Sequence, residues 1–186
     1  MPDMGIGLLG NANLIIKRKF RWTFQVTRAN GQDIPPNFVK LAGRPNIEIE
    51  EVELNYLNAK KWITGKASWQ TINVTYIDVA STLNQNLWNW LASCYDFTDP
   101  VNLHMGSSPQ DYAGTGILIM YDGCGTPLEQ WTLLDLWPTG INFGDDLDYS
   151  SSDEAQIELT LRYSNVQYQS LCPGFTPVGV CTPCGA

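Results

Sequence analysis

The sequence has little histidine, on which many enzymes depend. Beyond residue 66 it also has little lysine or arginine, on which nucleic-acid-binding proteins depend. It contains a single histidine, His104, and no nucleophile motif surrounds it, so a catalytic triad is not expected. Residues 1–66 hold ten basic and six acidic residues, whereas residues 67–186 hold one basic and thirteen acidic residues. Ordinary nucleic-acid binding needs a basic patch that neutralises phosphates, and this distribution argues against it. The same asymmetry suits a protein that stacks opposite faces on copies of itself, or one that repels DNA.

Long apolar runs are also absent. The N-terminal stretch is mildly apolar but is interrupted by asparagines and carries Asp3 where a signal peptide has basic residues. We therefore expect neither a secretion signal nor insertion into a membrane.

With 186 residues, 44% of them hydrophobic, and seven tryptophans, the chain should fold as one domain. We divide it into an N-terminal arm (1–16), a β domain (17–168) and a C-terminal tail rich in Cys, Pro and Gly (169–186).

Period-two alternation of apolar and polar residues predicts most of the secondary structure as strands. It is clearest in residues 17–27 and 155–163. In residues 47–57 the alternation slips between Ile49 and Val52, which predicts a bulge or a bend. The two arms from 47 to 64 form either a projecting loop that docks on a neighbouring molecule or a well-packed hairpin.

One helix is predicted, over residues 82–95, from apolar residues at three- and four-residue spacing. Thr82 and Gln85 suit a capping box at its start. Residues 116–121 form a continuous apolar run, which predicts a strand buried on both sides. The fold class is therefore mainly β: an antiparallel barrel or sandwich of six to eight strands with one helix packed on its side.

Five cysteines are present, and three of them, Cys172, Cys181 and Cys184, lie in the tail. These three are candidates for disulfides within or between subunits, and the odd total leaves a thiol for a partner chain. Free thiols are an alternative. A zinc site is another, but it would need His104 or a turn cysteine as a fourth ligand.

No metal or other cofactor is expected elsewhere. The acidic segment 145–154 lacks the glycine and glutamate positions of an EF-hand loop, so it is interpreted as a solvated loop.

Residues 131–163 join two strand-like runs through an aromatic-proline corner, Leu136-Trp137-Pro138-Thr139-Gly140. Proline fixes its own backbone and favours an extended conformation for the residue before it. Trp137 is thus presented at a defined place between strands, and we expect Trp137 and Pro138 at a subunit contact.

With this corner, the Leu147-Asp148-Tyr149-Ser150 segment and the strand 155–163, the chain resembles the tail tube proteins of contractile-tailed bacteriophages. That family shares its fold with the inner tubes of type VI secretion systems and pyocins. Residues 40–78, a loop, a bent hairpin and a strand that leads into the helix, have the order seen in the family. The resemblance covers residues 17–168, and the tail departs from it.

The resemblance implies a structural protein without catalytic residues, located in the virion tail and assembled in the host cytoplasm. Six subunits would form a ring whose sheets join into one continuous barrel, and stacked rings would form a DNA-delivery channel inside a contractile sheath. Implied partners are further copies of the chain, the sheath protein, the tape measure protein, baseplate or tail terminator proteins, and viral DNA that passes without specific binding.

An acidic channel would let DNA pass without counterion release, and our candidates for lining it are Glu129, Asp135 and Glu158. Besides Trp137 and Pro138, the candidates for the subunit interface lie on the predicted hairpin: Val52, Leu54, Tyr56, Leu57 and Trp62.

A second function class stays open, a carbohydrate-binding β-sandwich. Its stacking platforms would be four tryptophans, namely Trp62, Trp69, Trp131 and Trp137.

Overall fold

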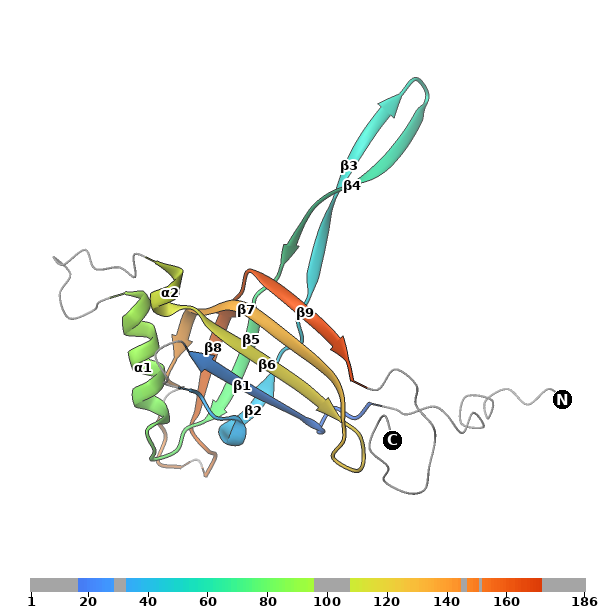
Figure 1. The fold of residues 1–186 in the computed structure, drawn as a ribbon. Coiled ribbons are helices and arrows are strands. Elements are labelled where there is room, and N and C mark those ends of the chain that lie inside the picture. The colour runs from blue at the N-terminus through green and yellow to red at the C-terminus, as the bar shows by residue number, and fades with distance from the viewer. Residues whose placement is uncertain (1–16, 29–32, 96–107, 145–146, 151, 172–186) are drawn as a thin grey trace.

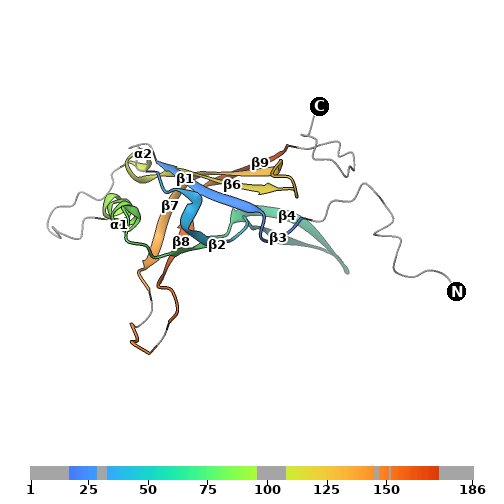
Figure 2. The ribbon, with the colours of Figure 1, turned by 90° about the horizontal axis from the view of Figure 1, so that it is seen from below.

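Two stacked β-sheets and a long projecting hairpin form most of the described part of the chain (Figures 1 and 2). The computed structural model describes residues 17–28, 33–95, 108–144, 147–150 and 152–171. The elements in chain order are β1 (Trp22–Arg28), η1 (Pro36–Phe38), β2 (Val39–Ala42), β3 (Ile47–Tyr56), β4 (Ala59–Trp69), β5 (Ile72–Ile77), α1 (Leu83–Cys94), α2 (Pro109–Tyr112), β6 (Gly114–Tyr121), β7 (Pro127–Asn142), β8 (Gln156–Arg162) and β9 (Asn165–Ser170).

All strand pairs are antiparallel, and the strand order is β1-β6-β7-β8-β5-β2. The first half of β7 pairs with β6 on one side and with β9 on the other, while its second half pairs with β8. One layer is therefore β1-β6-β7-β9 and the other is β7-β8-β5-β2. The predicted class, mainly antiparallel β with one helix at its side, is confirmed, and the sheets of the described chain do not close into a barrel.

A bulge bends β7 from one layer into the other. The pairing with β6 shifts register between Leu133 and Leu136, and between them Asp135 adopts φ 53°, a left-handed conformation that aspartate tolerates better than most residues. Gly116 faces the bend, where a Cβ would lie 2.8 Å from the Leu136 side chain. Absence of a side chain at Gly116 thus lets the two strands pack closely at the bend.

The predicted corner at Leu136–Gly140 is not a connection between strands, and this prediction is corrected. The segment lies within β7, where Trp137 pairs with Arg162 and Pro138 with Leu161. Proline is tolerated there because the second half of β7 is a sheet edge and the register shifts directly after Pro138.

The core lies between the layers and is built from alternate residues of each strand. In β6, Leu118 and Met120 point inward and are buried, whereas Ile117 and Ile119 on the other face are half-buried. The apolar run 116–121 thus has one buried face and not two. The inward side chains that pack together include Phe24, Val26, Val74, Tyr76, Leu133, Leu136, Ile157, Leu159 and Leu161.

Helix α1 closes one side of the space between the layers (Figure 2). Its buried residues Leu83, Leu87 and Trp90 join the core. The predicted capping box is wrong: the Thr82 side chain makes no cap hydrogen bond, and the Ser81 hydroxyl accepts from the Leu83 N–H instead, at 3.1 Å. The cause is that Thr82 already has helical dihedrals, φ −71° and ψ −3°, whereas a capping residue has an extended backbone.

Candidate assembly interface

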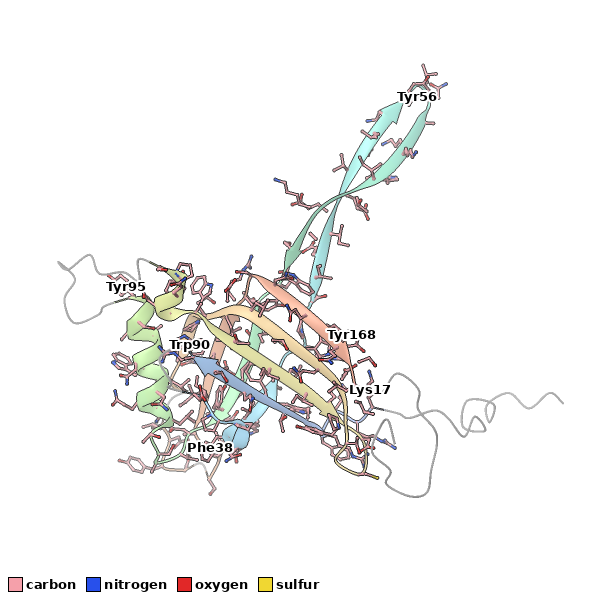
Figure 3. All side chains as sticks on the ribbon, viewed as in Figure 1. Lys17, Phe38, Tyr56, Trp90, Tyr95 and Tyr168 are labelled. Atoms are coloured by element: carbon pink, nitrogen blue, oxygen red, sulfur yellow. The ribbon has the colours of Figure 1, made fainter. Side chains whose placement is uncertain are left out.

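The β3–β4 hairpin projects from the two layers, and its tip carries Tyr56 (Figure 3). It forms a separate two-stranded sheet, and such ribbons are marginally stable alone in water. Five of the residues predicted to lie at a subunit interface are on it, and all are exposed: Val52 by 42%, Leu54 by 46%, Tyr56 by 76%, Leu57 by 89% and Trp62 by 57%. Three further exposed apolar residues are Ile47, Ile49 and Ile63.

The irregularity predicted in this segment is present as a register shift. Ile49 pairs with Ala67 and Glu51 with Thr64, so the extra residue belongs to β4. Gly65 is one of the two residues of β4 that face Glu50 there, and a Cβ on Gly65 would lie 3.0 Å from the carbonyl oxygen of Glu50. Toward the tip, Val52 is paired with Ile63 on one face of the ribbon and Glu53 with Trp62 on the other, so both faces offer apolar contact surface.

A buried carboxylate ties the base of the hairpin to the rest of the chain. Glu129 in β7 is 2% exposed and forms ion pairs with Lys17 and with Arg44, the latter at 2.7 Å. The Tyr168 hydroxyl lies 3.4 Å from the same carboxylate. Lys17 precedes β1, Arg44 lies between β2 and β3, and Tyr168 is on β9. Glu129 therefore joins three segments that are distant in the sequence.

The electrostatics of this group follow from its partners. Burial by itself raises the pKa of the Glu129 carboxyl, but the hydrogen bond from Lys17 and the charges of Lys17 and Arg44 outweigh it, and the pKa is lowered. Glu129 is ionised at neutral pH. As it is buried within the subunit, it is not available to line a channel in this conformation.

The other two channel candidates are on the surface. Asp135 is exposed at the bend of β7, and Glu158 is exposed on the outward face of β8. Beside Glu158, Thr160 and Asn73 are joined by a hydrogen bond of 3.2 Å on the same outward face. That face is polar, as expected of a surface that meets water.

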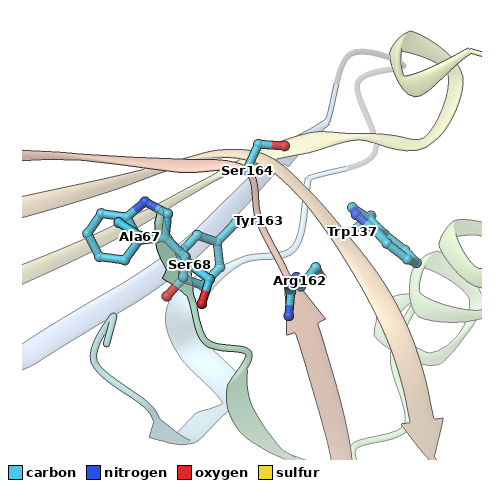
Figure 4. Close-up of a pocket in the computed structure, with 7 residues that line it drawn as sticks. Ala67, Ser68, Trp137, Arg162, Tyr163 and Ser164 are labelled. Carbon is cyan, nitrogen blue, oxygen red and sulfur yellow. The ribbon is translucent and has the colours of Figure 1, made fainter. Parts of the chain in front are cut away.

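A pocket of about 350 Å³ lies at the base of the hairpin, between β4, β7 and β8. Figure 4 shows Arg162 between Trp137 on one side and Ser68 and Tyr163 on the other. Trp137, which we expected at a subunit contact, is half-buried and forms a wall of this pocket, whereas Pro138 is buried. The remaining lining residues are Ala67, Trp69 and Ser164.

Three of the four tryptophans proposed as sugar platforms are packed against tyrosines. The ring centroids lie 5.9 Å apart for Trp69 and Tyr163, and 4.6 Å apart for Trp131 and Tyr168. Trp137 meets Tyr112 edge-on, at 6.0 Å. Only Trp62 is an exposed ring among the four, so these tryptophans do not form a shared stacking surface.

Sequence reasoning missed one charged group of the interior. Arg28 is 3% exposed, lies with its guanidinium 5.7 Å from the centre of the Trp90 ring, and donates to the Ser93 hydroxyl. Burial lowers the pKa of its side chain. The sequence did carry a signal for this: Arg28 follows Phe24 and Val26 at the same period-two spacing, so it occupies an inward-facing position of the strand.

The cysteines are only partly described. Cys94 is a free thiol, and burial raises its pKa. Cys124 is disulfide-bonded. The candidates Cys172, Cys181 and Cys184 lie outside the described residues, as does His104. Within the described ranges no group of His, Cys, Asp and Glu is arranged to hold a metal ion, and no helix there is long and apolar enough to cross a membrane.

No family model matches the chain, and no curated protein matches its sequence. Solved structures match its fold. A chain from the sheath/tube terminator of an extracellular contractile injection system, PVC, in the extended state has a TM-score of 0.65 at 17% identity, over 84% of this chain and 99% of that one.

Two further matches come from different assemblies. A chain from the PVC sheath–tube complex has a TM-score of 0.59 at 20% identity, over 86% of this chain and 95% of that one. The SPP1 tail tube has a TM-score of 0.54 at 8% identity, over 83% of this chain and 80% of that one. The chain therefore has the fold found in the SPP1 tail tube and in these contractile injection assemblies.

Proposed function

We propose that the protein is a structural subunit of a tail tube, in a phage tail or a related contractile injection particle. The observation that carries this proposal is the β3–β4 hairpin, whose apolar side chains have no covering partner in the described chain. Contiguous apolar surface of this kind marks a protein interaction site. The shared fold with tube assemblies supports a second copy as the partner.

The form of the assembly follows from the strand edges. Each layer ends in two edge strands, β1 and β9 in one layer and β2 and the second half of β7 in the other, and pairing between subunits would remove such edges. A ring of six subunits with joined sheets, stacked by contacts that do not close, gives a tube. In this arrangement Glu158 and Asp135 are our remaining candidates for an acidic lining along which DNA moves without binding.

The finer parts of the proposal are the phage-specific ones. They are a location in the virion tail after assembly in the host cytoplasm, a surrounding sheath, contact with tape measure, baseplate or terminator proteins, and DNA delivery. A non-enzymatic role agrees with the site described above, which consists of apolar side chains and ion pairs. Disulfides from Cys172, Cys181 or Cys184, within or between subunits, remain part of the proposal.

Electron microscopy of the purified protein, with light scattering for mass in solution, tests the proposal. The wild type should form rings or tubes. The double variant Tyr56→Asp and Leu57→Asp should remain monomeric, because two charges would have to be desolvated in the contact. At a concentration where the wild type is also monomeric, its thermal unfolding temperature should match that of the wild type, since both side chains are exposed.

Asn55→Asp is the matched control, because it adds a charge at an exposed neighbouring position that offers no apolar contact. It should assemble as the wild type does. A wild-type protein that stays monomeric at high concentration, and is retained on a polysaccharide column, would instead support the carbohydrate-binding alternative.

A further inference from the structure

Arg162 is charged, exposed and without a partner of opposite charge in the described chain. It is the single basic residue after Lys66, and it forms no ion pair or side-chain hydrogen bond with any described residue. It lines an open pocket at the base of the hairpin. An exposed arginine without an ionic partner is suited to bind a carboxylate, because its planar guanidinium donates to both carboxylate oxygens.

The walls of the pocket are held in place by packing within the subunit. Trp137 is fixed by its edge contact with Tyr112, and Tyr163 by its contact with Trp69. The volume of about 350 Å³ is near the lower end of the range for binding pockets, about 300–1,000 Å³. A few side chains would therefore fill it.

The loop between β7 and β8 presents a side-chain set of matching chemistry. In this loop Asp148 is flanked by Leu147, which is 93% exposed, and by Tyr149, which is fully exposed. Hydrogen bonds from the backbone and side chain of Ser150 lower the pKa of the Asp148 carboxyl, so it is charged at neutral pH. The Asp148 carboxylate is complementary in charge to Arg162, and its neighbours Leu147 and Tyr149 suit contact with the Trp137 ring, which lies beside Arg162 in the pocket.

The loop and the pocket lie at opposite ends of one strand. Strand β8 runs from Gln156, next to the loop, to Arg162 in the pocket, a span of about 20 Å at roughly 3.3 Å per residue. Figure 1 shows the loop below β8 and the base of the hairpin at the opposite end of the sheet. A subunit cannot fill its own pocket with this loop, but a copy displaced along β8 can.

We propose that the loop tip of one subunit, Leu147 to Tyr149, docks in the pocket of a subunit in the next ring, with Asp148 paired to Arg162. This inference rests on the proposed function and assigns the contact that holds successive rings together. Loop and pocket are different surfaces, so the contact is heterologous and propagates without closing. The interaction buries the one basic group of residues 67–186 against one of its thirteen acidic groups.

Charge reversal tests the pairing. Asp148→Arg and Arg162→Asp should each raise the protein concentration needed for stacking at least about tenfold, since each places like charges in contact. Single rings should still form, because the hairpin is unchanged. The double variant, with the charges exchanged, should recover most of the stacking. Asp111→Arg, a reversal at an exposed residue of α2, is the control and should stack as the wild type does.

The readouts are ring and tube counts by electron microscopy and sedimentation across a concentration series, with circular dichroism to establish that each variant is folded. Single reversals that stack as well as the wild type would overturn the docking contact while leaving the tube proposal intact. A double variant that stacks no better than either single one would also overturn it. A wild type that forms neither rings nor tubes would instead refute the proposed function and this contact with it.

Discussion

Replacing Glu129 with glutamine should destabilise the folded subunit by about 1–3 kcal/mol. Hydrogen bonds to a charged group contribute about 1.5–3 kcal/mol each, and Glu129 accepts from Lys17 and Arg44. The side chains of these partners are 44% and 54% exposed, so they regain water when the charge is removed, and the lower part of the range applies. Glutamine has the same shape and still accepts one hydrogen bond.

The effect should depend on pH with a defined sign. The pKa of Glu129 is lowered in the folded state, whereas an unfolded glutamate titrates near about 4.3. The carboxylate therefore stabilises the fold fully above the unfolded pKa, and this stabilisation is lost as the pH falls through the folded pKa. The difference in free energy of unfolding between the wild type and Glu129→Gln should be constant from about pH 6 to 8 and should shrink below about pH 4.

Urea unfolding followed by tryptophan fluorescence, at a concentration where light scattering shows monomers, measures this difference in free energy of unfolding. Glu158→Gln is the matched control, because it makes the same chemical change at an exposed residue that forms no ion pair within the described chain. It should stay within about 0.5 kcal/mol of the wild type. Equal stability of the two variants at pH 7, or a gap that does not shrink in acid, would refute the reasoning.

Two further predictions concern the fold. Gly116→Ala should lower the free energy of unfolding by about 1–3 kcal/mol through overpacking, because the new Cβ would lie 2.8 Å from the Leu136 side chain. Gly140→Ala, where a Cβ meets nothing within 4 Å, should change it by less than about 0.5 kcal/mol; similar losses for both would contradict the packing at the bend. Ser81→Ala should cost about 1 kcal/mol by removing the cap of α1, whereas Thr82→Ala should cost less. Thermal unfolding followed by circular dichroism compares these two variants. A larger loss for Thr82→Ala than for Ser81→Ala would show that Thr82 caps the helix after all.

Alternation identified the strands whose two faces differ in environment. Strand β8 was predicted within a residue or two because its apolar residues, such as Ile157 and Leu159, are fully buried and its polar ones face outward. Strand β9 was missed, since Asn165–Ser170 is short and polar, and it exists because it pairs with β7. Its formation depends on tertiary pairing and not on its own pattern.

The candidate site was predicted where it depends on exposed apolar residues. The hairpin residues, including Tyr56 and Trp62, were anticipated because they were hard to place in the core of a monomer. Glu129 was assigned to a surface from its charge alone. Its burial depends on Lys17 and Arg44, which are 112 and 85 residues away in the sequence, and no local pattern indicates such partners. The pocket around Arg162 likewise brings together β4, β7 and β8.

The shared strand β7 has a consequence for how the subunit opens. Because β7 contributes hydrogen bonds to both layers, neither layer can separate from the other without breaking ladder bonds on one half of the same strand. The layers should then exchange their amide hydrogens as one cooperative unit. The β3–β4 hairpin shares no ladder with them, so in an isolated subunit its amides should exchange much faster and become protected only when a neighbour covers it.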